Sequence, residues 1–285
     1  MKEKGPKKKT KLKPVGPAQR DSKRDVPIDR LTILLRAYVT RKKQRKKQGK
    51  PPRKLRPSDW TLIFDTETKT DQSQGLRFGS YQLRHRGALR ERGVFYDPKV
   101  PEAEIAIIHT VITQERAQAL GERINLMTRA EFVENVFLGK GYDLGALIVG
   151  LNLPFDLSRL SIDHDSARKS MKGGFSFVLS ERSDRPHLRI KHLNGHSALI
   201  DFAATEAEVR SRKKGNDEKE KLRLTERGYF VDLKTLSKTL TGQSHSLKSL
   251  SKLLRVKTPK IDADGHGQAL TEEYVRYGIR DTQTT

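Results

Sequence analysis

Two short apolar runs, each followed at once by acidic residues, constrain the fold of this 285-residue chain more than any other feature. The first run, 60–64, leads into the motif Asp-Thr-Glu at 65–67. The second run, 146–151, leads into Asn-Leu-Pro-Phe-Asp at 152–156. Short apolar runs of this kind are typical of buried strands. The sequence therefore predicts two interior strands that both end at carboxylates.

A third acidic motif, Tyr-Gly-Ile-Arg-Asp at 277–281, lies in a stretch with helical character. Its tyrosine and aspartate are four residues apart, so both project from one face of a helix. In the first motif, the aspartate and the glutamate alternate along a strand and share one face of the sheet. The three motifs thus offer four carboxylates and one tyrosine to a common site: Asp65, Glu67, Asp156, Asp281 and Tyr277.

The order and spacing of these motifs resemble the three exonuclease motifs of the DEDD superfamily of 3′–5′ exonucleases, in the form with a tyrosine in the third motif. The likeness is closest to the proofreading domain of family B DNA polymerases, whose second motif also reads Asn-x-x-Phe-Asp. It covers residues 58–285. The resemblance implies a ribonuclease-H-like α/β fold, in which a mixed sheet is flanked by helices. It also implies a metal-dependent 3′–5′ exonuclease.

The resemblance further implies a site for two Mg²⁺ or Mn²⁺ ions, which prefer carboxylate oxygens as ligands. Asp65 would bridge both ions. Glu67 and Asp281 would complete the ion that activates water, and Asp156 would hold the second ion directly or through water. Tyr277 would orient the attacking water, because a tyrosine with its ordinary pKa of about 10 is a poor base.

Residues beside the carboxylates are expected to contact the 3′ end of the substrate. The resemblance assigns this role to Thr66, Asn152 and Phe155. For Phe155, packing in the core beneath Asp156 is an equally good interpretation. Outside the motifs, Asp232 ends a predicted strand but has no place in the resembled pattern, and the triplet Asp-His-Asp at 163–165 is expected to be a solvated turn.

Positive charge is concentrated at the start of the chain. Residues 1–58 contain 22 Lys and Arg against 4 acidic residues, a net charge of +18, whereas residues 59–285 contain 36 against 31. We therefore expect a basic, largely disordered arm at 1–58 and an exonuclease-like domain at 59–285. A helix over 28–48 would either dock on a partner or DNA, or pack on the domain itself. Such an arm favours a polyanionic partner, although a nonspecific solubilising tail has a similar composition.

The expected partner is DNA with single-stranded or frayed 3′ ends, with RNA as an alternative. The chain has no cysteine, which excludes disulfides, zinc–thiolate sites and cysteine nucleophiles. No apolar run has the length of a membrane span, and no apolar segment follows the basic N-terminus as in a secretory signal. A cytoplasmic location is expected, associated with the nucleoid if the protein is bacterial. The sequence does not indicate an oligomeric state.

The remaining elements follow from local signals. Three antiparallel strands are predicted at 60–66, 76–84 and 92–97. A capping box begins a helix at Thr128, Pro154 enters another, and Asn-Gly at 194–195 indicates an inserted hairpin over about 186–202. A charged loop is expected at 205–224. The last strand is predicted at 229–233, followed by helices at 233–241, at 246–254 and from about 271.

These patterns favour an exonuclease that is the proofreading domain, or a fragment, of a family B-like polymerase. The chain stops four residues after Asp281, which suggests truncation within a longer gene. The alternatives are a stand-alone nuclease that processes DNA or RNA ends and a non-catalytic nucleic-acid-binding protein that uses the basic arm. The hairpin would either part a primer end from its template or simply extend the sheet.

Overall fold

The computed structural model describes residues 58–118, 124–195, 197–205, 229–260 and 267–285. The predicted helix at 28–48 and all but the last residue of the predicted arm lie outside the described residues. Most of the charged loop predicted at 205–224 also lies outside them. The division into an arm and a domain therefore stays a prediction.

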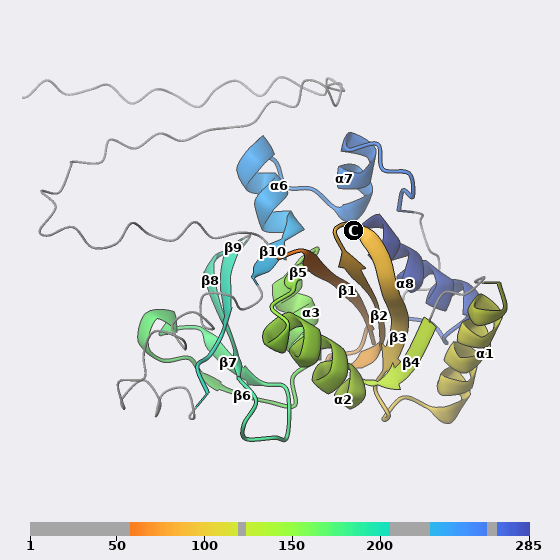
Figure 1. Cartoon of the computed structure of the whole chain (residues 1–285), viewed down its shortest axis with the longest axis horizontal. Coiled ribbons are helices and arrows are strands. Elements are labelled where there is room, and N and C mark those ends of the chain that lie inside the picture. Colours follow the sequence, from red (N-terminus) through yellow and green to blue (C-terminus); the bar gives the residue numbers. More distant parts are fainter. Residues whose placement is uncertain (1–57, 119–123, 196, 206–228, 261–266) are drawn as a thin grey trace, which may run out of the picture.

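A mixed six-stranded sheet forms the centre of the described structure (Figure 1). Its strand order is β10-β5-β1-β2-β3-β4. Strands β1, β2 and β3 pair antiparallel, whereas β5 is parallel to β1, β10 to β5, and β4 to β3. The bounds are β1 (Trp60–Thr68), β2 (Leu76–His85), β3 (Ala88–Tyr96), β4 (Ile124–Thr128), β5 (Leu147–Gly150) and β10 (Phe230–Asp232). The predicted antiparallel trio, the second interior strand and the last strand are confirmed.

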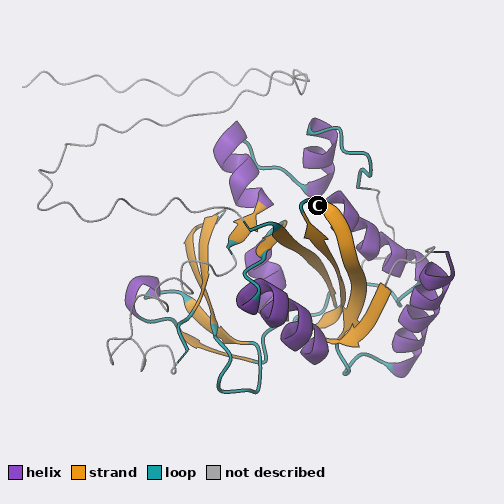
Figure 2. Ribbon diagram, in the orientation of Figure 1, coloured by secondary structure: helices purple, strands orange, loops and turns teal. Residues whose placement is uncertain are grey.

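Helices cover both faces of this sheet (Figure 2). On one face lie α1 (Glu102–Gln118) and α8 (Glu272–Thr284). On the other lie α3 (Leu153–Arg159) and α2 (Arg129–Glu131), which continues into the π-helical segment η2 (Phe132–Asp143). Residues 76–83 of β2 are all buried because both faces are covered there. The expected α/β class, a mixed sheet flanked by helices, is confirmed.

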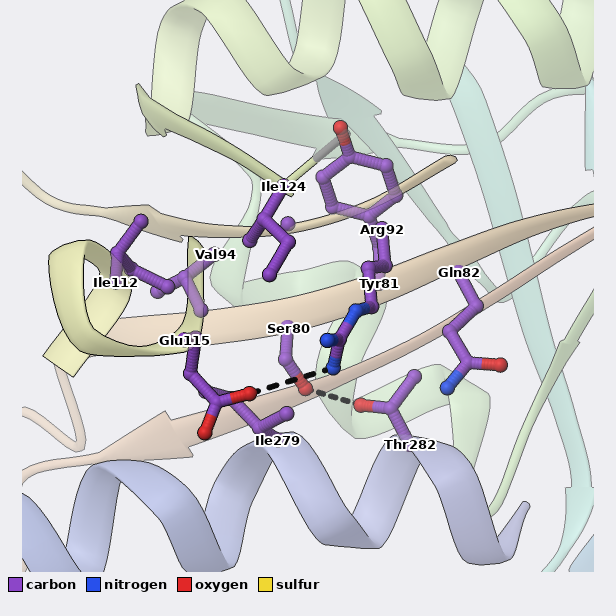
Figure 3. Close-up of a pocket in the computed structure, with 11 residues that line it drawn as sticks. Ser80, Tyr81, Gln82, Arg92, Val94, Ile112, Glu115, Ile124, Ile279 and Thr282 are labelled. Atoms are coloured by element: carbon purple, nitrogen blue, oxygen red, sulfur yellow. Dashed lines mark hydrogen bonds and ion pairs between the residues drawn. The ribbon is translucent and has the colours of Figure 1, made fainter. Parts of the chain in front are cut away.

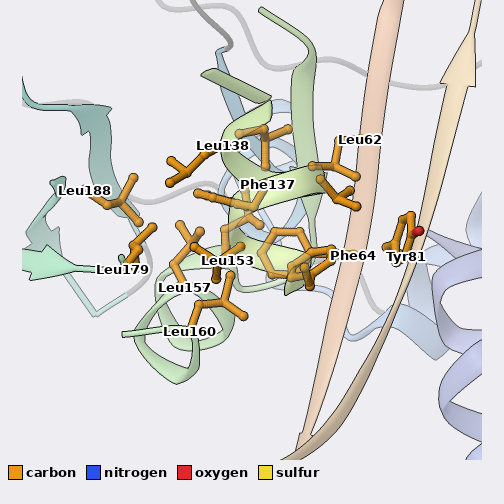
Figure 4. Packing of buried hydrophobic residues seen from close by; sticks show 14 of the residues in the cluster. Leu62, Phe64, Tyr81, Phe137, Leu138, Leu153, Leu157, Leu160, Leu179 and Leu188 are labelled. Carbon is orange, nitrogen blue, oxygen red and sulfur yellow. The ribbon is translucent and has the colours of Figure 1, made fainter. Parts of the chain in front are cut away.

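The larger hydrophobic core lies between the sheet, η2 and α3 (Figure 4). Leu62 and Phe64 of β1 pack there against Phe137 of η2 and Leu153 of α3. The helices begin where the sequence signals place them. Thr128 and Glu131 form the predicted capping box, and Pro154 sits in the first turn of α3.

A second sheet with the order β6-β7-β8-β9 packs on the far side of η2 and α3 (Figures 1 and 2). Its strands are β6 (Asp163–Ser166), β7 (Phe175–Val178), β8 (Leu188–Asn194) and β9 (Ser197–Phe202). The predicted hairpin is confirmed as β8 and β9. The expectation of a turn at 163–165 is wrong, because these exposed residues form edge strand β6, paired with β7.

Three helices complete the described chain: α6 (Leu233–Thr241), α7 (Leu247–Leu253) and α8. Their positions agree with the predicted helices. Among the described residues, no helix has both the length and the apolar character that a membrane crossing requires.

Helix α8 is fixed tightly to β2, which matters because it carries Asp281. Ser80 of β2 donates a hydrogen bond of 2.9 Å to the backbone carbonyl of Gly278 and also contacts the hydroxyl of Thr282 (Figure 3). A Cβ atom at Gly278 would lie 2.7 Å from the ring of Phe78, so only glycine permits this approach. Asp281 is consequently 2% exposed, although it lies in the last turn of the helix.

Candidate metal centre

Three elements bring the acidic motifs together at one edge of the six-stranded sheet. Asp65 and Glu67 lie in the second half of β1, and Asp156 lies in α3, directly after β5. Because β1 and β5 are parallel neighbours, their carboxyl ends reach the same edge. Helix α8, packed on β1 and β2, adds Asp281.

The first and third motifs together form a compact carboxylate group. Asp65, Glu67 and Asp281 each offer one carboxylate oxygen, and these oxygens all lie within 4.8 Å of one another. Oxygen donors of this kind suit a hard divalent cation. These three residues are therefore able to hold a metal ion.

The fourth predicted ligand, Asp156, lies outside this group of three but interacts with it electrostatically. Its Oδ1 accepts a 2.6 Å hydrogen bond from the hydroxyl of Thr66, and both residues are buried. The charge of Asp156 contributes to a raised pKa at Asp65. We name Asp65, Glu67, Asp156 and Asp281 the carboxylate cluster. Thr66, predicted to contact substrate, here positions one member of this cluster.

The carboxylate cluster is electrostatically unfavourable in the absence of a cation. Burial raises the pKa of Asp65 well above its ordinary value, and the charges of neighbouring carboxylates raise it further. Burial likewise raises the pKa of Glu67 to about 7, and it raises the pKa of Asp156. Like charges buried together disfavour ionisation, and a bound cation reverses that preference. The donor set and its electrostatics therefore both fit a divalent cation.

Tyr274 is a site residue that the sequence motifs did not identify. Its hydroxyl donates a 2.5 Å hydrogen bond to Oε2 of Glu67 and thereby orients that carboxylate. Burial raises the pKa of Tyr274, and the charge of Glu67 raises it further, so the hydroxyl stays protonated as a donor. Its position three residues before Tyr277 on the same helix is the signal that points to it. The two rings stack, with centroids 5.7 Å apart.

Lys260 is the second residue that the motifs did not identify. Its Nζ donates a 2.5 Å hydrogen bond to Oδ2 of Asp281 and lies 5.0 Å from the ring centroid of Tyr277. Burial lowers the pKa of Lys260, but its hydrogen bonds to Asp281 and Tyr277 outweigh burial and raise that pKa above the ordinary value. Lys260 therefore supplies positive charge beside the carboxylate cluster and holds the predicted water-orienting tyrosine.

The second motif also shapes the surface next to the carboxylate cluster. Asn152 adopts a left-handed backbone conformation (φ 69°) before α3. The carboxylate of Asp232 at the end of β10 holds this turn, because its Oδ1 accepts hydrogen bonds from the backbone N–H groups of Asn152 (2.7 Å) and Leu153 (3.2 Å). The other oxygen of Asp232 caps α6 through the N–H of Thr235. Asp232 thus has a positioning role that the motif pattern did not indicate.

Phe155 is partly exposed and lines a cavity beside α3, so it is not a fully buried core residue. The guanidinium of Arg159 lies 4.7 Å from the centroid of its ring. The placement of Asn152 and Phe155 on this cavity is compatible with the predicted substrate contacts.

No protein-family model matches this chain. A search of curated proteins likewise gives no match.

Proposed function

We propose that this protein is a metal-dependent 3′–5′ exonuclease that hydrolyses phosphodiester bonds at nucleic-acid 3′ ends, with single-stranded or frayed DNA as its substrate. The observation that carries the proposal is the convergence of Asp65, Glu67 and Asp281, from motifs more than 200 residues apart, within 4.8 Å. The antiparallel β1, β2 and β3 followed by parallel β5 and β10 are compatible with the ribonuclease-H-like fold that the motifs imply. We further propose that it serves as, or derives from, the proofreading domain of a family B-like polymerase.

The proposed chemistry assigns each residue a distinct task. Asp65, Glu67 and Asp281 would hold one cation, and Asp156 with Asp65 would hold a second. Bound divalent cations would stabilise the negative charge on the attacking and leaving oxygens of the phosphodiester.

The tyrosines and the substrate residues complete the proposal. Tyr274 keeps Glu67 oriented, and Tyr277 would orient the attacking water as a hydrogen-bonding group. Asn152 and Phe155 would position the terminal nucleotide, since they lie on the surface beside Asp156.

The test is hydrolysis of a 5′-labelled single strand by the full chain in Mg²⁺. We expect stepwise shortening from the 3′ end, complete inhibition by EDTA, and loss of hydrolysis in Asp65→Asn and Asp281→Asn. Asp163→Asn is the matched control, because Asp163 is an exposed aspartate on β6 outside the carboxylate cluster. A wild-type rate in either cluster variant contradicts the assignment.

A further inference from the structure

A cavity of about 350 Å³ lies between the start of α3 and one face of the four-stranded sheet. The sheet side is built by alternation along the strands. Phe175 pairs with Ile190, and Phe177 pairs with Leu188, so all four side chains lie on the same face. Leu188 and Ile190 are buried in the core, whereas Phe175, farther out on this face, is 50% exposed.

Two aromatic rings on this face lie against each other. Phe175 and Phe177 stack with their centroids 5.9 Å apart and an interplanar angle of 23°. His192, two residues after Ile190 on β8, continues the same face and is exposed. We name Phe175, Phe177 and His192 the aromatic face.

The opposite wall of the cavity belongs to the second acidic motif. Asn152 and Phe155 line it, and Asp156 of the carboxylate cluster follows Phe155 directly in α3. The cavity is therefore next to the candidate metal centre along the same helix. A strand whose 3′ end lies at the carboxylate cluster would have its terminal nucleotides within reach of this cavity.

The chemistry of the cavity suits nucleobases better than phosphates. None of the described residues that line it is acidic or carries an ammonium or guanidinium group. Its volume is within the range of small-molecule sites, roughly 300–1,000 Å³. Aromatic side chains on a sheet stack unpaired bases irrespective of sequence, and the Asn152 amide and His192 imidazole add hydrogen-bonding groups at the edge. Phe175 is half-exposed, and its ring contacts those of Phe177 and His164.

We propose that this cavity binds an unpaired nucleobase of the substrate strand, stacked on the aromatic face and opposite Phe155. The proposal rests on the function proposed above and extends its substrate site from the carboxylate cluster to the four-stranded sheet. Single strands engage this subsite because their bases are free to leave the stack, whereas paired bases are not.

The first test measures the affinity of the full chain for a fluorescent oligothymidylate, with Ca²⁺ as the only divalent cation. Phe175→Ala should weaken binding roughly 5- to 150-fold, the range for loss of one base–aromatic stack. Phe175→Tyr should retain affinity because it keeps the ring. Leu199→Ala is the matched control, because Leu199 is 47% exposed on β9 but pairs with Lys191 on the opposite face of the same sheet.

The second test scans an abasic nucleotide along the oligonucleotide from its 3′ end. At one position near that end, the abasic substitution should weaken binding to the wild type, and Phe175→Ala should cause no further loss there. If no abasic substitution weakens binding to the wild type, the proposal is wrong. This result does not depend on whether Phe175→Ala folds. Wild-type affinity in Phe175→Ala also overturns it.

The cavity proposal and the nuclease proposal can fail independently of each other. If the wild type degrades the strand and Phe175→Ala binds it normally, the cavity proposal alone is wrong. If the wild type binds bases in the abasic scan without hydrolysing the strand, the nuclease proposal alone is wrong.

Discussion

Replacing Glu67 with glutamine should stabilise the metal-free protein at alkaline pH. The folded structure raises the pKa of Glu67 from an ordinary 4.5 to about 7, mainly through burial. A raised pKa means that the folded state binds the proton more tightly than the unfolded state. This contribution to stability is fully present below pH 4.5 and is lost as the pH rises through about 7.

The size of the effect follows from the shift in pKa. Each pKa unit corresponds to 1.36 kcal/mol, so the difference between 4.5 and about 7 amounts to about 3 kcal/mol. Glutamine has nearly the same shape, still accepts the hydrogen bond from Tyr274, and carries no charge at any pH. Asp65 and Asp156 also have raised pKa values, but both residues remain in Glu67→Gln, so the stability they lose as the pH rises is lost in the variant as well as in the parent.

The assay is urea unfolding in EDTA at a series of pH values from 5 to 9. The free energy of unfolding of Glu67→Gln should exceed that of the parent by up to about 3 kcal/mol at pH 9. The two values should approach each other at pH 5. Glu181→Gln, which removes an exposed carboxylate outside the cluster, should follow the parent throughout. Equal losses of stability in Glu67→Gln and the parent between pH 5 and pH 9 would mean that folding does not raise the pKa of Glu67.

Three further predictions concern other parts of the chain. Asp232→Ala should lower the free energy of unfolding by about 1 kcal/mol, because α6 loses its N-terminal cap. Asp232→Asn should recover part of this loss. Unchanged midpoints of urea unfolding would contradict the capping role. Tyr277→Phe should slow single-turnover hydrolysis less than Asp65→Asn does, because it leaves the carboxylate ligands in place; an equal loss would argue against a water-orienting role. Deletion of residues 1–58 removes a net charge of +18, so affinity for single strands should fall and its salt dependence should flatten, while turnover at saturation stays constant. If the deletion leaves the salt dependence of affinity unaltered, residues 1–58 do not contribute to nucleic-acid binding.

The sequence predicted those features that depend on local pattern. Three such features are each encoded within a few residues, and the structure has them all. They are the strand containing Asp65, the start of α3 at Pro154 and the capping box at Thr128. Helix α1 was not predicted, because its isoleucines and valine are β-branched residues that are also common in strands. Packing against the sheet and α8 decides its conformation.

Side-chain partners across the fold were harder to predict. Tyr274 reaches Glu67 across 207 positions of sequence, and the contact depends on how α8 is rotated against β1. Lys260 lies in an irregular segment before α8, so no periodicity connects it with Asp281. The four-residue strands β6 and β7 are too short to give a clear alternation, which is why the aromatic face was not predicted.

Direct titration with Mn²⁺, followed by electron paramagnetic resonance of the free ion, tests the central claim that the carboxylate cluster holds divalent cations. We expect saturable binding of two ions to the full chain near neutral pH, loss of that binding in Asp65→Asn, and unchanged binding in Asp163→Asn. Mn²⁺ binding of equal affinity and stoichiometry in Asp65→Asn and the wild type would show that the carboxylate cluster does not hold these ions.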